Sequence, residues 1–125
     1  MSANNTFYTK DHEWLKVEGQ VATVGITDHA QQALGDITFV DLPKVGKAVK
    51  AHEVLLVVES VKAASDVFAP VSGTVSAVND ALATAPELIN QAAQTDGWLC
   101  KLSPFIPAVS ELMTAEQYAA FLQES

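Results

Sequence analysis

Glu59-Ser60-Val61-Lys62-Ala63 is the stretch around which the rest of the chain is organised. The run before it, Val54–Val58, is entirely apolar, as in a strand buried on both faces of a sandwich. The run after it, Ala64–Phe68, has the composition of a second strand, and Pro70 ends it because proline cannot donate a ladder hydrogen bond. Two strands separated by so few residues form a hairpin. We therefore expect Lys62 to stand at the tip of a hairpin.

Length and composition predict one domain over residues 1–125. Nearly half of the 125 residues are apolar (49%), which suffices for a single well-formed core. No apolar run exceeds five residues, whereas a transmembrane helix needs about 20. The start, Met1–Thr6, has neither the basic nor the apolar region of a signal peptide, and it lacks the arginines of a transit peptide. These features predict a cytoplasmic protein without a membrane segment.

The charge balance excludes several classes of partner. The chain has seven lysines, no arginine and fifteen Asp plus Glu residues, which gives a formal net charge of −8. Binding to nucleic acids or anionic membranes depends on clustered Lys and Arg, so neither is expected here. Without arginine the chain also lacks the usual bidentate phosphate clamp. A nucleotide-dependent enzyme is therefore disfavoured.

The first third of the chain predicts two strands and a short helix. Tyr8–Val17 is strand-like, Glu18-Gly19 forms a turn, and Gln20–Ile26 supplies the return strand. Thr27 is a good helix N-cap, and Gly35 is placed to end that helix in the left-handed conformation.

The middle of the chain predicts another strand and a short internal repeat. From Ile37 the pattern alternates, with Ile37 and Phe39 on one face and Val40 on the other. Pro43–Val49 and Pro70–Val75 share a proline, two residues, a glycine and a valine-bearing strand. Such a repeat fits a quasi-symmetric flattened barrel in which each half contributes matching turns and strands.

The last third predicts one short helix, a final strand and a C-terminal helix. Pro86 suits the first position of a one-turn helix that continues to Ile89. Residues 91–96 read as a polar loop, residues 97–102 as a strand, and Pro104 and Pro107 as breaks after it. Thr114 and Gln117 form a capping box for a helix at about 115–123, which should dock through Tyr118, Phe121 and Leu122.

The side chains that could carry chemistry do not predict an enzyme. A lysine at a hairpin tip is usually a solvated turn residue, and Glu59 and Asp66 favour the protonated amine, which is a poor Schiff-base nucleophile. No Ser/His/Asp order, phosphate loop or cysteine pair is present. The three histidines, His12, His29 and His52, lack metal-ligand spacing. Cys100 reads as a packing residue, and Trp14 and Trp98 read as core anchors.

The hairpin sequence resembles the lipoylation site of the glycine cleavage system H proteins. Glu59-Ser60-Val61-Lys62-Ala63 followed by Ala64-Ser65-Asp66 is similar to the stretch whose lysine carries lipoate in that family. The resemblance extends from Tyr8 to Tyr118 through further segments in the family's order and approximate spacing: His12-Glu13-Trp14, Val24-Gly25-Ile26-Thr27, Ala30-Gln31, Leu34-Gly35-Asp36, Val40-Asp41-Leu42-Pro43, Ala69-Pro70-Val71-Ser72-Gly73, Val78-Asn79, Pro86-Glu87-Leu88-Ile89-Asn90 and Gly97-Trp98.

This resemblance implies a fold, a cofactor and partners. The fold would be mainly β, a barrel-sandwich hybrid like the flattened barrels of lipoyl and biotinyl carriers, with short helices and a C-terminal helix. Lipoate would be attached as N6-lipoyl-lysine at Lys62, with Glu59, Ser60, Val61 and Ala63 as the attachment hairpin. The arm would carry the aminomethyl group of glycine between three enzymes: glycine decarboxylase, aminomethyltransferase and dihydrolipoamide dehydrogenase. A lipoate ligase or lipoyl transferase would attach the arm, and the chain itself would catalyse no step.

The resemblance also suggests where the loaded arm docks. The strand that holds Glu13, with Asp11 beside it, and the hairpin residue Asp66 would form the walls of a cleft for the cationic amine. One departure concerns a Pro-Tyr pair that H proteins commonly carry, because Ala93 and Gln94 occupy those positions here. Two alternatives stay open: an H-like lipoyl donor or relay for 2-oxoacid dehydrogenases, and an unmodified β-sandwich binding module.

Overall fold

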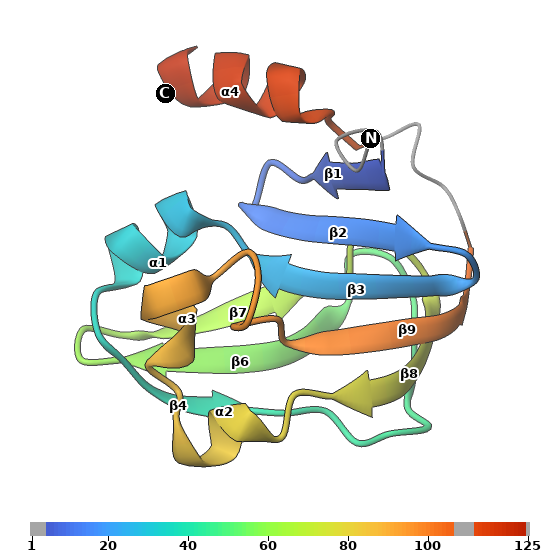
Figure 1. Ribbon diagram of the computed structural model, residues 1–125, viewed down its shortest axis with the longest axis horizontal. Coiled ribbons are helices and arrows are strands. Elements are labelled where there is room, and N and C mark those ends of the chain that lie inside the picture. The colour runs from blue at the N-terminus through green and yellow to red at the C-terminus, as the bar shows by residue number, and fades with distance from the viewer. Residues whose placement is uncertain (1–4, 107–111, 125) are drawn as a thin grey trace.

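The computed structural model describes residues 5–106 and 112–124, which form two antiparallel sheets (Figure 1). The strands are β1 Thr6–Tyr8, β2 Glu13–Glu18, β3 Val21–Ile26, β4 Ile37–Asp41, β5 Ala48–Val49, β6 Val54–Ser60, β7 Ala64–Phe68, β8 Gly73–Val78 and β9 Cys100–Phe105. The larger sheet has the order β1-β2-β3-β9-β8-β5, and the smaller sheet has the order β4-β6-β7. The mainly-β prediction is confirmed, although the two sheets do not close into a barrel.

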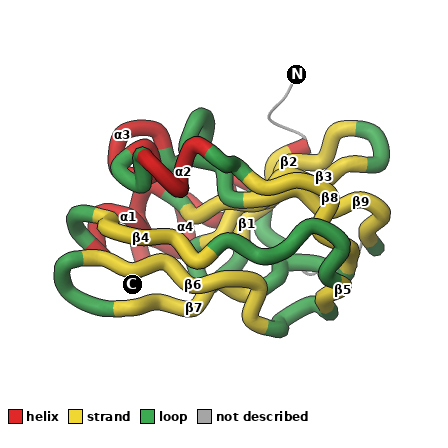
Figure 2. Tube along the Cα trace, turned by 90° about the horizontal axis from the view of Figure 1, so that it is seen from below, coloured by secondary structure: helices red, strands yellow, loops and turns green. Residues whose placement is uncertain are grey.

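In the described residues four helices accompany the sheets: α1 Asp28–Leu34, α2 Ala81–Thr84, α3 Leu88–Ala92 and α4 Ala115–Glu124. The first three gather at one end of the sandwich, and α4 lies outside β1 (Figures 1 and 2). In the described ranges, no helix is long and apolar enough to cross a membrane. As predicted, Thr27 caps α1 by accepting a hydrogen bond from the Ala30 amide (3.2 Å).

The core fills the space between the two sheets. Val24 and Leu102 from the larger sheet and Leu55 and Val58 from the smaller sheet are 1% exposed or less. Cys100 belongs to the same core, and burial raises the pKa of its thiol to about 12. The thiol is therefore protonated at neutral pH, which confirms its prediction as a packing residue.

The strand predicted over Tyr8–Val17 is interrupted by a turn. Thr9 causes the break, because its carbonyl accepts from the His12 amide (3.1 Å) and its hydroxyl accepts from the Glu13 amide (3.1 Å). His12 has a φ of 67°, a conformation that no strand residue adopts. The turn separates β1 from β2 and allows β1 to fold back on it, with Tyr8 opposite Trp14.

The alternation predicted from Ile37 is also wrong. A register shift between Ile37 and Phe39 in the pairing of β4 with β6 places Ile37 and Val40 in the core, both 4% exposed, and leaves Phe39 51% exposed. The neighbouring strand β6 is less buried than predicted, because Val54 is 42% exposed. Gly35 ends α1 with a positive φ as expected, but its ψ of −155° lies in a region open almost only to glycine and not in the left-handed helical region.

The segment from residue 81 to 105 differs most from its prediction. The short helix α2 was not expected, and α3 begins at Leu88 and continues to Ala92, into the predicted polar loop. The last strand begins at Cys100, three residues later than predicted, and includes Pro104. Pro107 lies outside the described residues.

The internal repeat corresponds to two segments that pair with each other. β5 and β8 are antiparallel, with Ala48 opposite Thr74 and Val49 opposite Gly73. Each copy therefore contributes a turn and a short strand to the same edge of the larger sheet. The two copies of the repeat thus lie side by side in one sheet and do not close a barrel.

The C-terminal helix docks as its apolar positions predict. Tyr118 is 6% exposed and stacks on Tyr8 with ring centroids 4.7 Å apart. The Tyr118 hydroxyl also lies 2.8 Å from His12 Nδ1 and 2.8 Å from the Thr27 hydroxyl. The predicted capping box is present: the Gln117 amide donates to the Thr114 hydroxyl (3.2 Å), and the Thr114 amide donates to Gln117 Oε1 (2.9 Å).

Trp14 is the core anchor that the sequence predicts, whereas Trp98 is only half-buried and lies under the Lys101 ammonium group. The Trp14 indole N–H donates to the Ala93 carbonyl (3.0 Å), and its ring covers Gly25, the opposite residue of β3. A Cβ atom at position 25 would lie 2.5 Å from the ring. Only glycine permits this ring position.

We predict that Gly25→Ala lowers the free energy of unfolding by about 2 to 4 kcal/mol, because the indole must move and lose its hydrogen bond. Gly19→Ala is the matched control. Gly19 lies in the turn between β2 and β3, in the same hairpin, but has open space around it. Its positive φ of 62° should cost only about 1 kcal/mol. Urea unfolding followed by circular dichroism measures both; equal losses would contradict this packing account.

Candidate functional site

Lys62 stands at the tip of the β6–β7 hairpin, as predicted, and its side chain is exposed. Ser60 shapes the tip. Its amide donates to the Ala63 carbonyl (2.8 Å), and its hydroxyl oxygen accepts from the amides of Lys62 and Ala63 (3.2 Å each). Local hydrogen bonds of this kind hold the backbone of a turn in one conformation. Val61 is 66% exposed beside the lysine, and Glu59 is exposed on β6.

The tip does not project freely but rests on the end of α1. The Val61 amide donates to the Asp36 carbonyl (3.0 Å), and Lys62 Nζ donates to the Ala33 carbonyl (3.3 Å). Gly35 lies under the lysine stem, where an added Cβ would be 3.7 Å from Lys62 Cε. A cation at a helix C-terminus satisfies a free carbonyl, so this position suits an ammonium group.

Asn90, on α3, holds the segment on which the tip rests. Its Nδ2 donates to the Gly35 carbonyl (2.9 Å) and to Gln31 Oε1 (2.9 Å), and its Oδ1 accepts from the Ile37 amide (2.9 Å). The sequence around Asn90 predicts no role for this residue. Asn90 ends the family-like segment Pro86–Asn90, but that position gives no indication of its partners, which lie more than fifty residues away.

Glu13 is the buried carboxyl group of the site. It is 2% exposed, its Oε1 accepts from the Thr9 hydroxyl (2.9 Å), and its Oε2 accepts from the Phe68 amide (2.8 Å). Burial raises the pKa of Glu13 to about 7, against the lowering effect of these two hydrogen bonds, and the nearby Asp11 raises it further. Near neutral pH this carboxyl group can therefore hold or release a proton.

The Glu13 carboxyl group, which belongs to β2, contacts the free edge of β7 at Phe68. The same strand carries Asp66. Asp66 is exposed and two residues closer to the tip than Phe68, so it lies about 7 Å along the edge from the Glu13 contact. A cavity of about 330 Å³ begins beyond Phe68, lined by Tyr8, Thr9, Lys10, Asp11, Glu13, His52, Ala69, Pro70, Leu112 and Met113. Asp11 and Glu13 thus line one cavity, and Asp66 lies on β7 between Lys62 and Phe68.

The fold brings together two further groups of residues from separate segments. The rings of His12 and His29 stack with their centroids 4.4 Å apart, although the two residues belong to different segments. Burial, together with His29, lowers the pKa of His12. Within the described part of the chain, no three His, Cys, Asp or Glu side chains gather as a metal site would need. Ala93 and Gln94 also have partners, since Gln94 Oε1 accepts from the Asp28 amide (3.0 Å) at the start of α1.

Comparisons with known proteins assign the family. The family model of the glycine cleavage H-proteins matches residues 6–125. The chain belongs to the glycine cleavage H-protein family. It is 52% identical to the glycine cleavage system H protein of Acidiphilium cryptum over 94% of this chain and 95% of that protein. The H protein of Bradyrhizobium diazoefficiens is 61% identical over 78% of this chain and 80% of that protein.

A solved structure shows the same fold. The crystal structure of a glycine cleavage system H protein from Mycobacterium marinum superposes with a TM-score of 0.87. It shares 42% sequence identity, over 95% of this chain and 97% of that chain. These relatives are named for glycine cleavage, so the relay for 2-oxoacid dehydrogenases and the unmodified binding module are not favoured.

Glu13 should make stability depend on pH. Its pKa of about 7 in the folded chain lies above the unfolded value of 4.5, so the folded state binds the proton more tightly. This contribution to stability is fully present below about pH 4.5 and is lost as the pH rises through about 7. We predict a loss of roughly 2 to 3 kcal/mol across this range in the parent, relative to Glu13→Gln, which cannot titrate.

Urea midpoints measured at pH 5, 6, 7 and 8 test this prediction. Asp11→Asn is the control, because it removes a neighbouring charge but leaves the buried carboxyl group in place. Curves for the parent and Glu13→Gln that run parallel over the whole range would show that Glu13 is ionised throughout, against the raised pKa.

Proposed function

We propose that this chain is the lipoyl carrier of a glycine cleavage system and that lipoate is attached to Lys62. The observation that carries the proposal is the presentation of the lysine: an exposed primary amine on a tip whose backbone is fixed by Ser60 and Asp36. An attachment site needs an amine that a ligase can reach in a recognisable shape, and these residues supply both. The lipoyl dithiolane would supply the thiol chemistry that accepts the aminomethyl group.

The surroundings of Lys62 support a carrier and not a catalyst. Among the described residues, the ammonium group has one hydrogen-bond partner, the Ala33 carbonyl, and no base or second cation is positioned to activate it. The tip would fix the root of the arm, and the long side chain with its acyl group would move between active sites. A tethered group reaches successive sites at a high effective concentration without being lost by diffusion.

The partners follow from this role. They would be glycine decarboxylase, aminomethyltransferase and dihydrolipoamide dehydrogenase, with a lipoate ligase or lipoyl transferase for attachment. Glu59, Ser60, Val61 and Ala63 would form the surface that the attaching enzyme recognises. The whole chain would act as one lipoyl-carrier domain.

Lys62→Arg should abolish lipoylation and leave the fold intact, because the side chain is exposed and a guanidinium group is no substitute for an amine acceptor. The variant and the parent are incubated with lipoate, ATP and a lipoate ligase, and their intact masses are compared. Lys50→Arg, at another exposed lysine, is the control and should be lipoylated like the parent. A lipoyl-sized gain in the mass of Lys62→Arg would identify another acceptor.

The edge of β7 would provide a resting place for the loaded arm. A cationic amine carried from Lys62 would pass Asp66 and reach the cavity that contains Glu13 and Asp11. Carboxylates in a partly desolvated cavity hold a cation more strongly than they do in bulk water. Docking there would protect the aminomethyl cargo from hydrolysis between visits to the enzymes.

Replacing these carboxylates should shorten the life of the cargo. We predict that Glu13→Gln with Asp66→Asn speeds formaldehyde release from aminomethyl-loaded protein by about two- to fivefold, since a partly exposed ion pair contributes about 1 kcal/mol or less. Asp80→Asn with Glu87→Gln makes the same charge change at exposed helix starts away from the cavity and should have no effect. If all three proteins release formaldehyde at one rate, the two carboxylates do not protect the cargo.

A further inference from the structure

His52 has a backbone conformation that residues other than glycine rarely adopt. Its φ is 76°, in the left-handed region where the neighbouring carbonyl group crowds the Cβ atom. His52 is the third residue of a turn that is closed by a hydrogen bond from the Glu53 amide to the Lys50 carbonyl (3.0 Å). A positive φ at this position of a turn ordinarily selects glycine or asparagine. A histidine here therefore costs folding free energy that a glycine would not cost.

The surrounding structure holds this strained turn in place. The Ala51 amide donates to the Ser72 hydroxyl (2.9 Å). The His52 amide donates to the Ala69 carbonyl (2.8 Å), and the Ala69 amide donates to the Glu53 carbonyl (2.8 Å). A residue keeps a strained conformation only where its surroundings fix it in this way. The root of the His52 side chain is consequently held beside the residue that follows β7.

The His52 side chain stands at the mouth of the cavity that contains Glu13. It is exposed and belongs to the lining of this space of about 330 Å³. Ala69, which accepts from the His52 amide, comes directly after Phe68. The Phe68 amide donates to Glu13 Oε2 (2.8 Å). The exposed imidazole and the buried carboxyl group therefore lie at the same end of β7.

The imidazole of His52 has no partner among the described residues that explains its strained backbone. His12, with a similar φ of 67°, brings its Nδ1 atom 2.8 Å from the Tyr118 hydroxyl and stacks its ring on His29. Within the described ranges, no hydrogen bond, ion pair or ring contact involves the His52 imidazole. A neutral imidazole donates one hydrogen bond and accepts another. Both remain available to a bound molecule.

The lining of the cavity suits a small cation at the end of an apolar chain. Asp11 and Glu13 supply two carboxyl groups, and Lys10, which is exposed, is the one lysine of this lining. Leu112 and Met113 supply apolar wall. A cation on an apolar stem would therefore find carboxyl groups for its charge and apolar side chains for its stem.

A primary ammonium group matches the number of acceptors. It has three N–H donors, and the carboxyl groups of Asp11 and Glu13 account for two of them. The exposed imidazole of His52 can turn toward the cavity and accept the third. In the described part of the chain, these groups do not gather as a metal ion would need. An ammonium nitrogen lies about 3 Å from its acceptors and so fits a wider arrangement than a metal ion does.

An arm attached to Lys62 is long enough to bring such a group to the cavity. β7 covers about 14 Å from Ala64, near the tip, to Phe68, at the cavity. A lysine side chain extended by a lipoyl and an aminomethyl group has about sixteen bonds between Cα and the amine and spans roughly 19 Å. An arm that lies along β7 therefore ends at the cavity.

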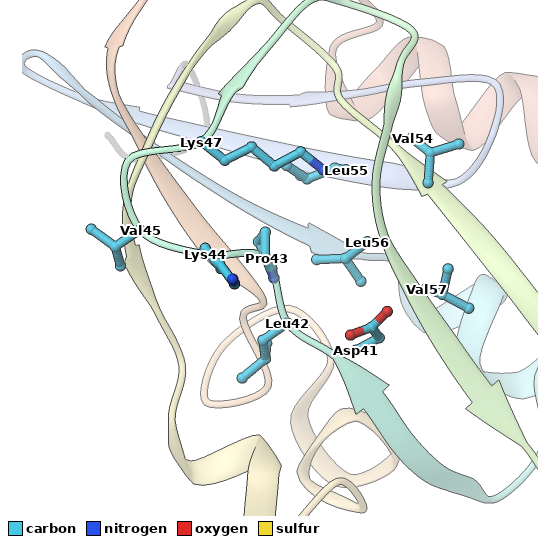
Figure 3. A pocket seen from close by; sticks show the side chains of 10 residues that line it. All are labelled: Asp41, Leu42, Pro43, Lys44, Val45, Lys47, Val54, Leu55, Leu56 and Val57. Atoms are coloured by element: carbon cyan, nitrogen blue, oxygen red, sulfur yellow. The ribbon is translucent and has the colours of Figure 1, made fainter.

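A second hollow, of about 570 Å³, is a poor destination for a cation. It lies between β6 and the β4–β5 loop (Figure 3). Two lysines, Lys44 and Lys47, line it together with one carboxylate, Asp41. The excess of positive charge disfavours a cationic guest there, whereas the two carboxyl groups beside His52 favour one.

We propose that His52 is a cargo-binding residue, whose imidazole accepts a hydrogen bond from the cationic amine at the end of the arm on Lys62. Asp11 and Glu13 accept the other two hydrogen bonds of that amine. The inference rests on the proposed function for the identity of the amine. The strain in the turn then serves binding, because glycine at this position would stabilise the fold but would leave the third donor without a protein partner.

The alternative is a turn residue without a role, since histidine adopts the left-handed conformation more readily than most side chains. The two interpretations predict different effects of His52→Gly. If the residue has no role, the variant is more stable and otherwise unchanged. If the residue binds the cargo, the variant is more stable and holds its cargo less well.

The first experiment compares His52→Gly with Ala51→Gly, a change in the same turn outside the cavity lining. His52→Gly should lower the equilibrium constant of urea unfolding by about two- to fivefold, because it removes the strain, and Ala51→Gly should raise it by about the same factor. In aminomethyl-loaded protein, His52→Gly should release formaldehyde about two- to fivefold faster than the parent, and Ala51→Gly at the parent rate.

The proposal is overturned if His52→Gly is more stable but releases formaldehyde at the parent rate. Equally fast release by both variants would assign the effect to the rigidity of the turn and not to the imidazole, which also overturns it. A loss of stability in His52→Gly would show that the turn is not strained, with the same consequence.

The second experiment needs no lipoylation. In Lys62→Cys the new thiol is exposed, whereas Cys100 is buried and protonated and does not react. Alkylation therefore attaches a synthetic arm of similar length at position 62. The arm ends in a primary amine or, as the matched control, in a hydroxyl group.

Spectra of the ¹⁵N-labelled imidazole nitrogens and backbone amides report the contact. We expect the amine-ended arm to shift an imidazole nitrogen of His52 and the Phe68 amide, which donates to Glu13. The hydroxyl-ended arm should shift neither, and His29, outside the cavity lining, should respond to neither arm. An unchanged His52 signal with the amine-ended arm, or equal shifts with both arms, overturns the proposal.

These outcomes distinguish the inference from the proposed function. A parent protein that gains no lipoyl mass contradicts the carrier role, and the synthetic arm still decides whether His52 binds a cationic amine. Conversely, a parent that is fully lipoylated, with a His52 signal that does not respond to the synthetic amine, retains its carrier role and loses His52 as a binding residue.

Discussion

The two sheets of this protein are not closed into a barrel, so side chains must make the contacts between them. The carboxyl group of Glu13 makes the most specific of these contacts. It accepts one hydrogen bond from Thr9 beside its own sheet and one from the Phe68 amide at the free edge of the other sheet. Among the described residues, Glu13 is the one Asp or Glu that is buried. Burying this carboxyl group costs free energy. The two hydrogen bonds offset that cost only when the sheets hold Thr9 and Phe68 within hydrogen-bond distance of it. The site and the sandwich therefore depend on the same residue.

The lysine that defines the site is positioned mainly by backbone groups and not by a cluster of reactive side chains. The end of α1, ordered by Gly35 and Asn90, supplies the carbonyls that meet the hairpin tip. Such contacts fix where the root of a long side chain lies without restricting the chemistry of its end. This arrangement would suit a lysine that several enzymes recognise and that reacts with none of its neighbours.

Much of the architecture could be predicted from local signals. The hairpin, the cap at Thr27 and the capping box at Thr114 each depend on residues within a few positions of one another, and all three were predicted correctly. The errors have two causes. The turn after Thr9 is local but interrupts a run that has the composition of one strand, whereas the register shift after Ile37 arises from the pairing of β4 with β6 and changes which side chains face the core.

The same distinction applies to the candidate site. Lys62 could be found from the sequence because a tip is a local feature. Asn90 could not, since its partners at Gln31, Gly35 and Ile37 lie more than fifty residues away and are brought together only by the packing of α3 on α1. Pro104 within β9 is a similar case, because a proline is a reliable break only where the ladder needs its missing N–H.

The hydrogen bond from Lys62 to the Ala33 carbonyl has a consequence for how the carrier matures. Before modification, a full positive charge holds the side chain against the negative end of α1. Amide formation would remove that charge and leave a single N–H, so the reason for resting on the helix would largely disappear. The unmodified lysine is held at the end of the helix, and an acylated lysine would not be held there. The covalent step that gives the arm its cargo-carrying group would thus also give it the freedom to swing, without any change in the fold.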